Sequence, residues 1–199
     1  MQLVVGLGNP GAQYARTRHN AGFWLVDALV EQCQARFRSE PRYQGELAAV
    51  TIAGKTMAVL KPMAFMNTSG ASINAYANYF RIPVTEILIV HDELDLAPGV
   101  ARLKRGGGHG GHNGLRDIVG LLGTDFVRLR LGIGHPGAAD DVVRYVLNVP
   151  TSDDRDAIDG AITRALEEIP EIVGGRLDAA MNRLNRRATD TGPPATDSQ

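Results

Sequence analysis

Residues 3–22 read LVVGLGNPGAQYARTRHNAG, and the fold can be worked out from this stretch outward. Residues 3–5 form a short apolar run, which predicts a buried strand. The glycines, asparagine and proline of residues 6–11 predict a tight turn directly after that strand. Open α/β sheets bind ligands just past the carboxyl ends of their buried strands. We therefore expect the polar side chains that follow, His19 among them, to lie beside a ligand.

The turn after this strand also admits two simpler interpretations. Gly6 and Gly8 resemble the start of a dinucleotide-binding fingerprint, but its third glycine is missing, because the next glycine is Gly11. His19, taken alone, is equally well explained as an ordinary histidine at a helix start. The residues around His19 are what favour a functional role.

The composition predicts one soluble globular domain. The chain has 199 residues, 44% of them hydrophobic and 22% charged, and this length supports one core without requiring two. Cys33 is the one cysteine of the sequence, which excludes an internal disulfide and favours a reducing compartment. Its place on an apolar helix stripe predicts core packing. The N-terminal residues show neither a basic stretch nor a long apolar run, so we expect no signal peptide, no membrane span and a cytoplasmic location.

The charges are unevenly distributed along the chain. The net charge is −1, which by itself argues against binding nucleic acid. Residues 101–149 are nevertheless rich in arginine and lysine, whereas residues 151–173 are rich in aspartate and glutamate. A basic segment beside an acidic one allows a one-sided surface for a polyanion, although solvated helix faces would give the same pattern.

Strand-like and helix-like segments alternate along most of the chain. Strands are predicted at residues 45–53 and 56–61 (a hairpin), 86–90, 100–104 and 128–132, and helices at 20–36, 70–80, 114–122, 140–147, 153–170 and 175–187. This order predicts an α/β fold: a single domain over residues 1–188, with a mixed central β-sheet flanked by helices on both faces. Residues 189–199 have no apolar residue able to anchor them, which predicts a disordered tail.

The glycine-rich run GGGHGGHNG at residues 106–114 is the second unusual stretch. A metal site does not fit, because two histidines with no nearby cysteine or carboxylate do not complete a tetrahedral set. A phosphate loop of the Walker type does not fit either, because the Gly-Lys-Ser/Thr ending is missing. A flexible connector remains possible. A loop that frees backbone N–H groups and brings Asn113 to a helix N-terminus suits an anionic or oxyanionic ligand better.

Two further segments carry candidate chemistry. Asp92 follows the strand predicted at residues 86–90, where it can face another strand-end residue such as His19. A buried aspartate beside an imidazole fixes its tautomer and stabilises its protonated form, as a general base requires. Asn67 stands near a helix start, where capping is the simpler interpretation. Ser69 lacks the Gly-x-Ser-x-Gly elbow, so a serine nucleophile is not expected.

These motifs together resemble those of the bacterial-type peptidyl-tRNA hydrolases. The matching strings are GLGNPGxxYxxTRHNxG, KPMAFMNTSG, HDELDLxPG and GGGHGGHNG, in the family's order, and the resemblance covers about residues 1–187. One departure is Ala97, which stands where a second proline is common. The resemblance implies an esterase that separates a peptide from the terminal ribose of tRNA. It also implies a monomer that needs neither a metal nor a cofactor.

The resemblance also implies roles for individual residues. His19 would be the general base that deprotonates a water, and Asp92 would orient it. Asn113 and Asn67 would hold the water and the developing oxyanion, while Asn9 would contact the peptide and help reject substrates with a free α-amino group. The remaining implied contacts are Tyr14, Phe65, Met66 and His112 lining the cleft around the terminal nucleotide and first peptide unit, and Lys104 and Arg130 clamping the 5′-phosphate of tRNA. Met66, taken alone, is typical of core packing.

Two alternatives from other classes remain open. A non-catalytic RNA-binding relative would be expected to lack His19 or Asp92, and this chain has both. A nucleotide-binding oxidoreductase would need the complete glycine fingerprint and an acidic ribose ligand about 20 residues further on. Neither feature is present.

Overall fold

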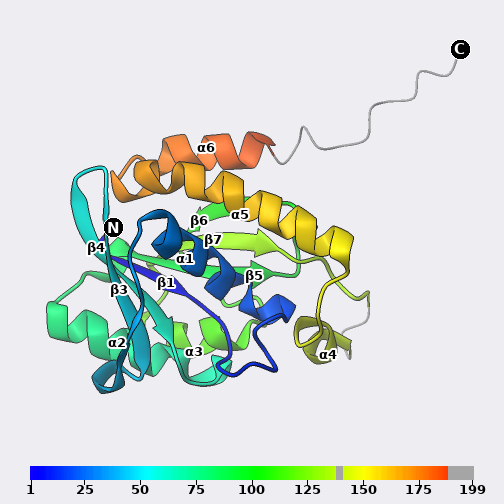
Figure 1. Ribbon diagram of the computed structural model, residues 1–199, viewed down its shortest axis with the longest axis horizontal. Coiled ribbons are helices and arrows are strands. Elements are labelled where there is room, and N and C mark those ends of the chain that lie inside the picture. The colour runs from blue at the N-terminus through cyan, green and yellow to red at the C-terminus, as the bar shows by residue number, and fades with distance from the viewer. Residues whose placement is uncertain (138–140, 188–199) are drawn as a thin grey trace, which may run out of the picture.

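The chain folds around one mixed sheet. The computed structural model describes residues 1–137 and 141–187, so the predicted tail lies outside the described residues (Figure 1). Seven strands pair in the order β2-β3-β4-β1-β5-β7-β6. Their bounds are β1 Leu3–Gly6, β2 Arg38–Glu40, β3 Gly45–Ile52, β4 Lys55–Pro62, β5 Ile87–Glu93, β6 Ala101–Arg105 and β7 Val127–Gly132. The strand β1 is parallel to β4 and β5, and β5 is parallel to β7, whereas the outer pairs are antiparallel. The predicted mixed sheet is confirmed.

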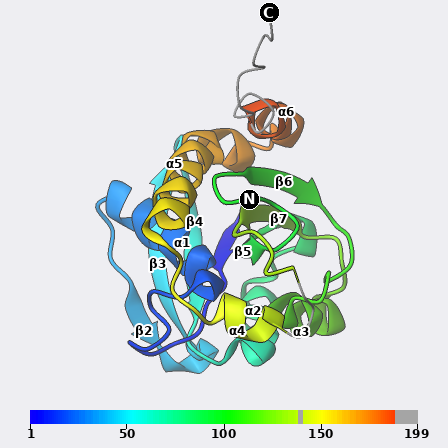
Figure 2. The ribbon, with the colours of Figure 1, turned by 90° about the vertical axis from the view of Figure 1, so that its right-hand side faces the viewer.

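Helices cover both faces of this sheet. They are α1 Ala21–Gln32, α2 Ser69–Phe80, α3 Asn113–Leu122, α4 Val142–Val146, α5 Ser152–Val173 and α6 Leu177–Arg187. Figures 1 and 2 show α2 and α3 on one face and α1, α5 and α6 on the other. None of the helices in the described part of the chain is both long enough and apolar enough to cross a membrane.

The opening strand supplies both layers of the core. Leu3, Val4 and Val5 are completely buried, and successive side chains of a strand point to opposite faces. Val4 accordingly packs in the cluster beneath α1, α5 and α6, while Leu3 and Val5 pack in the cluster beneath α2 and α3. A strand that is buried on both faces has apolar residues at successive positions, as residues 3–5 do.

Glycines let α1 begin directly against the strand ends. A Cβ at Gly22 would lie 2.4 Å from the carbonyl oxygen of Val90, and a Cβ at Gly6 would lie 2.5 Å from that of Gly22. Side chains at these positions would therefore force the helix away from the sheet. The approach places the preceding 3-10 turn, Arg18–Asn20, at the carboxyl ends of β1 and β5.

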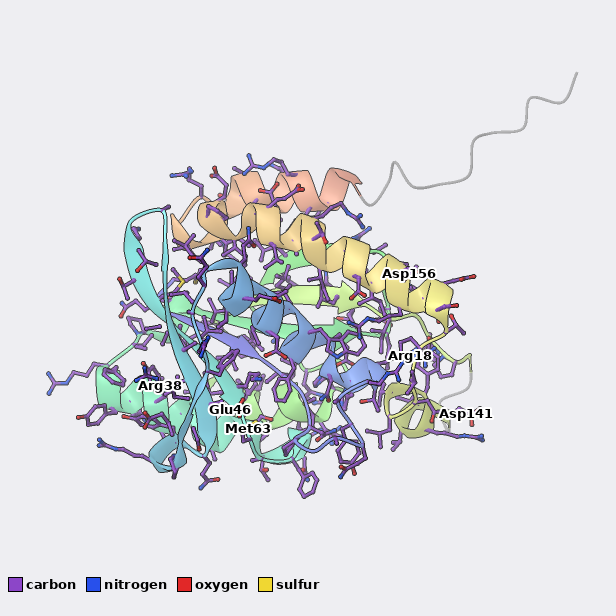
Figure 3. The ribbon with its side chains drawn as sticks, in the orientation of Figure 1. Arg18, Arg38, Glu46, Met63, Asp141 and Asp156 are labelled. Carbon is purple, nitrogen blue, oxygen red and sulfur yellow. The ribbon has the colours of Figure 1, made fainter. Side chains whose placement is uncertain are left out.

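Arg18 connects the same turn to a segment that is distant in the sequence. Its guanidinium donates to Asp154 at 3.1 Å and to the carbonyl of Val149 at 3.2 Å. Figure 3 shows Arg18 beside the N-terminal end of α5. The His19 segment is therefore held from two sides.

Several predicted boundaries were wrong. The strand predicted to end at residue 90 continues to Glu93, because its last residues still pair with β7. The first helix ends at Gln32 rather than near residue 36, since Gln34 adopts a left-handed conformation with φ of 53°. Helix α5 continues through Pro170 to Val173. The short edge strand β2 was not predicted, because its sequence is polar and has no alternation to detect.

Candidate active site

A cleft of about 910 Å³ opens at the carboxyl ends of the central strands. The structure brings all of the predicted site residues to its wall. They are Asn9, Tyr14, His19, Phe65, Met66, Asn67, Asp92, Lys104, His112, Asn113 and Arg130. These residues come from separate segments of the chain, so the fold itself assembles the cleft.

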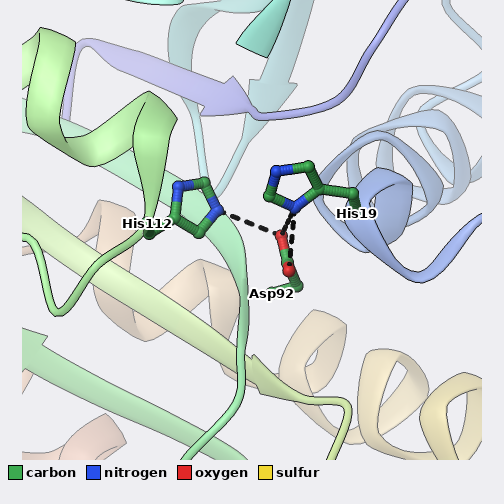
Figure 4. A group of neighbouring side chains, drawn as sticks. All are labelled: His19, Asp92 and His112. Atoms are coloured by element: carbon green, nitrogen blue, oxygen red, sulfur yellow. Dashed lines mark hydrogen bonds and ion pairs between the residues drawn. The ribbon is translucent and has the colours of Figure 1, made fainter. Parts of the chain in front are cut away.

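His19 and Asp92 form a buried pair at the base of this cleft. The Nδ1 atom of His19 lies 3.0 Å from each carboxylate oxygen of Asp92 (Figure 4). His19 is 8% exposed and Asp92 is 3% exposed. An ionised carboxylate only accepts hydrogen bonds, so Nδ1 of His19 carries the proton and donates it to Asp92. The Nε2 atom is then left with a free lone pair, which is what a general base requires.

The two groups shift each other's pKa. Burial alone would lower the pKa of His19, but the charge of Asp92 and the hydrogen bond to it outweigh burial and raise that pKa above 6.5. Burial alone would raise the pKa of Asp92, but His19 and His112 hold it well below its usual range. Asp92 is therefore ionised at neutral pH.

His112 has a role that the sequence did not reveal. Its Nε2 atom donates to Asp92 at 3.1 Å, while its Nδ1 atom accepts from the backbone N–H groups of Gly114 and Leu115. His112 therefore caps helix α3 and binds the carboxylate that holds His19. Histidine is not among the usual capping residues, so no local signal pointed to this arrangement.

The same three side chains do not fit a bound metal ion. The ligand-type atoms of His19, Asp92 and His112 lie within 4.8 Å of one another. A neutral imidazole that binds a metal through Nε2 must carry its proton on Nδ1. In His112 that atom already accepts two backbone N–H groups. The arrangement instead suits a carboxylate that accepts one N–H hydrogen bond from each imidazole.

Asn9 is fixed in place by its neighbours. Its backbone N–H donates to Oδ1 of Asn20 at 2.8 Å, and Asn20 donates back to the Asn9 carbonyl at 3.0 Å. The side-chain oxygen of Asn9 accepts the backbone N–H of Met66 at 2.8 Å. Its amide N–H₂ has no partner among the described residues, so it is available as a donor. Although Asn20 occupies the N-cap position of α1, its side chain makes no capping hydrogen bond and holds Asn9 instead.

Asn113 and Asn67 differ in how they are held. The oxygen of Asn113 accepts from the guanidinium of Arg116 at 3.0 Å, so Asn113 also presents its N–H₂ group as a donor. Asn67 is exposed in the turn Met66–Thr68, and its side chain forms no hydrogen bond within the described part of the chain. The cap position of α2 belongs to Thr68 rather than to Asn67.

His91 is a buried cleft residue that sequence reasoning passed over. It is 1% exposed, and its Nδ1 donates to the backbone carbonyl of Asp92 at 2.7 Å. Its ring meets that of His112 edge-on, with centroids 5.1 Å apart. Burial, followed by the proximity of His112, lowers the pKa of His91 to about 3, so its ring is neutral. The signal available was its place directly after the strand predicted at residues 86–90.

Four cations share one face at the β6–β7 edge of the sheet. The register pairs Lys104 with Arg128 and Arg102 with Arg130, and residues directly opposite in a sheet lie on the same face. Glu93 lies 3.7 Å from Arg130. Lys104, Arg128 and Arg130 all line the cleft, so one end of it is strongly positive.

The cleft and the fold have clear counterparts among known proteins. Residues 3–192 match the sequence model of the family described as peptidyl-tRNA hydrolase. The chain is 53% identical over 185 residues to a peptidyl-tRNA hydrolase of Halorhodospira halophila, covering 92% of this chain and 95% of the relative. It is 54% identical over 187 residues to that of Alcanivorax borkumensis, covering 93% and 96%. The crystal structure of peptidyl-tRNA hydrolase from Acinetobacter baumannii is similar with a TM-score of 0.91 and 48% identity, covering 93% and 94%.

Proposed function

Because this chain belongs to the peptidyl-tRNA hydrolase family, we propose that its cleft hydrolyses the ester between a peptide, or an N-blocked amino acid, and the terminal ribose of tRNA. The products are the free peptide and a tRNA that can be charged again. The observation that carries this proposal is the buried His19–Asp92 pair, which leaves one imidazole nitrogen free to act as a base.

Water is the nucleophile in this mechanism. The Nε2 atom of His19 takes a proton from a water molecule, and the resulting hydroxide attacks the ester carbonyl carbon. The tetrahedral intermediate then breaks its bond to the ribose oxygen, which receives the proton from His19. Asp92 accepts the hydrogen bond from the Nδ1–H of His19 throughout the reaction. The imidazolium that forms after the first proton transfer, and is consumed by the second, therefore lies next to a negative charge.

Asparagine amides stabilise the intermediate and select the substrate. Asn113 presents its N–H₂ group toward the developing oxyanion, with Asn67 beside it holding the water. Asn9 presents a donor to the peptide side, where the carbonyl of an N-acyl group is a suitable acceptor. A free α-ammonium offers no acceptor at that point, so substrates with a free amino group bind less well.

The tRNA occupies the positive end of the cleft. Lys104 and Arg130 hold the 5′-phosphate, while Tyr14, Phe65 and Met66 line the space for the terminal nucleotide and the first peptide unit. Every residue of the proposed site comes from one chain, so the reaction needs no second copy. We propose a monomeric enzyme that acts in the cytoplasm, where translation produces its substrate.

A direct test uses purified protein and N-acetyl-aminoacyl-tRNA without added metal. We expect release of free N-acetyl amino acid, and we expect a His19→Ala variant with an unchanged circular dichroism spectrum to release none above background. Tight binding of tRNA without release by the wild-type protein would instead support a non-catalytic RNA-binding relative.

A further inference from the structure

Arg128 is a buried cation that the proposed reaction does not use. It lies on β7 and is 3% exposed. The two terminal nitrogens of its guanidinium donate to the backbone carbonyls of Gly107 and Gly108. Its guanidinium carbon lies 4.7 Å from the centre of the Phe126 ring. The strand β7 and the ring of Phe126 therefore hold Arg128 in one position. From there its guanidinium binds the backbone of the glycine-rich loop.

Apart from Arg128, the loop between β6 and α3 is tied down at its start, where the N–H of Gly106 donates to the carbonyl of Phe126 at 3.0 Å. Gly106, Gly107, Gly110 and Gly111 all have positive φ, between 55° and 100°. A Cβ added at Gly108, Gly110 or Gly111 would meet nothing within 4 Å, so these positions are not packed against other groups. Without side chains to bury, such a loop depends on hydrogen bonds to its backbone for a fixed shape.

This loop joins two parts of the proposed site. It begins directly after Arg105, the residue that follows Lys104, and the Nζ of Lys104 lies 3.1 Å from the position of a Cβ at Gly107. It ends at His112, which binds Asp92, and at Asn113. A shift of the loop would therefore alter the catalytic hydrogen bonds at one end and the phosphate contact at the other.

The surroundings of Arg128 are electrostatically unfavourable for a cation. Lys104 lies opposite it in the sheet register and Arg130 lies two residues along the same face. Burial, and then the charge of Arg130, lower the pKa of Arg128. Its partners in the loop are uncharged carbonyls, so the contacts that it makes are directional rather than charge-neutralising.

We propose that Arg128 is a positioning residue that fixes the loop of residues 106–111 through the carbonyls of Gly107 and Gly108, and so places His112 and Asn113 for the reaction. Arg128 lines the cleft, but it is 3% exposed and both terminal nitrogens of its guanidinium already donate to these carbonyls, so it does not contact the tRNA phosphate. This role rests on the proposed hydrolase function and adds to it a residue outside the reacting groups.

The test compares Arg128→Met and Arg128→Lys on two substrates, N-acetyl-aminoacyl-tRNA and a short N-blocked ester that lacks the tRNA body. We expect Arg128→Met to lower kcat about 10-fold or more on both substrates, because misplaced catalytic groups lose rate on any ester. Its dependence on salt concentration should match that of the wild type. Arg128→Lys should recover part of the rate, since an ammonium can still donate to a loop carbonyl. Arg105→Met is the matched control, because Arg105 is exposed and pairs with Asp178 away from the cleft.

Amide hydrogen exchange gives a second measurement that does not require activity. The N–H groups of Gly111 and His112 are bonded within the loop to His109. In Arg128→Met we expect them to exchange at least several-fold faster, while amides of β5 keep their wild-type rates. Unchanged loop exchange would overturn the proposal even if the wild-type protein hydrolysed nothing. A loss confined to the tRNA substrate, with a weaker salt dependence, would also overturn it by making Arg128 a phosphate contact.

Discussion

The carboxylate of Asp92 accepts hydrogen bonds from two histidines, and the two bonds have different consequences. His19 gains a raised pKa and a fixed tautomer from the contact. His112 remains anchored by the backbone of α3, so its bond holds the carboxylate at a fixed angle. One acid thereby orients the base and connects it to the loop that carries Asn113.

The pairing predicts a specific pH dependence. The base must be unprotonated, so the wild-type kcat/KM should rise with pH through one ionisation whose midpoint lies above 6.5. Asp92→Asn removes the counter-charge, so that midpoint should move to lower pH and the rate should fall about 10²-fold. Rate measurements on N-acetyl-aminoacyl-tRNA from pH 5 to 9 check both effects. An Asp92→Asn enzyme with the wild-type rate and midpoint would contradict the pairing.

His91 predicts a loss of stability in mild acid. Its pKa is about 3 in the folded protein and 6.5 in the unfolded chain, so only the unfolded chain takes up a proton between these values. The free energy of unfolding should therefore decrease as pH falls from 6.5, by up to about 1.4 kcal/mol per pH unit. His91→Asn should show a gentler slope in urea unfolding between pH 7 and 4.5, where Asp92 stays ionised. The exposed His135, changed to Asn, should keep the wild-type slope; equal slopes for His91→Asn and the wild type would refute this account.

Asn9 has a structural and a selective role that two variants can separate. Asn9→Asp keeps an oxygen for the Met66 N–H but loses the amide donor, whereas Asn9→Ala loses both. Only the alanine variant should lose about 1–3 kcal/mol of stability, because it leaves a buried N–H unpaired. Both should reduce the preference for N-blocked over free aminoacyl-tRNA, measured as a ratio of kcat/KM values. A constant ratio in both variants would leave Asn9 with the turn as its sole role.

At the scale of elements, the site depends on how closely α1 approaches the sheet. The helix begins one residue after Asn20, so any displacement of α1 moves His19 away from Asp92. Gly22 is the point of closest approach, since an added Cβ would meet backbone atoms of Val90 and Leu7. Backbone atoms cannot move aside as a flexible side chain can.

A pair of glycine substitutions tests this dependence. Gly22→Ala should reduce the free energy of unfolding by about 2 kcal/mol or more and should lower kcat, because the helix must shift. Gly120→Ala in α3 is the control: its Cβ would meet nothing within 4 Å, so it should stabilise the protein by about 0.5–1 kcal/mol. The free energies of unfolding of both variants, measured by urea unfolding, check these two expectations. Equal stabilities would show that the sheet accommodates a side chain at Gly22.

At the scale of the whole molecule, a net charge of −1 conceals a strongly positive end of the cleft. Asp153, Asp154, Asp156 and Asp159 lie in α5, which covers one face of the sheet. Lys104 and Arg130 point to the opposite face, because their strand neighbours Leu103 and Leu129 pack beneath α5. Separated charges of this kind give a surface that attracts phosphate on one side while the total stays near zero.

This separation predicts how salt affects the enzyme. Replacing Lys104 or Arg130 by alanine should weaken the binding of tRNA substrates. It should also reduce the dependence of kcat/KM on salt concentration, since the loss of a phosphate contact means that fewer counterions are released on binding. Hydrolysis of a short N-blocked ester without the tRNA body should be nearly unaffected. Equal losses on both substrates would exclude a phosphate clamp.

The sequence alone predicted most of the elements, with β2 the exception, and the candidate residues named from it. The run of residues 3–5, the glycine turn after it and the hairpin of β3 and β4 all depend on local preferences, which a single segment expresses by itself. The candidate residues were carried by motif strings and by the family resemblance. The structure then placed all of them around one cleft.

The connections between these residues could be known only from the folded chain. Asp92 lies 73 residues from His19 and 20 from His112, and no local pattern states that one carboxylate serves both. The extension of β5 to Glu93 depends on pairing with β7, and the anchoring of the glycine-rich loop depends on Arg128 across the sheet. Local propensity determines which conformation a segment prefers. Contacts between distant segments decide which donor meets which acceptor, because those partners become neighbours only when the core packs.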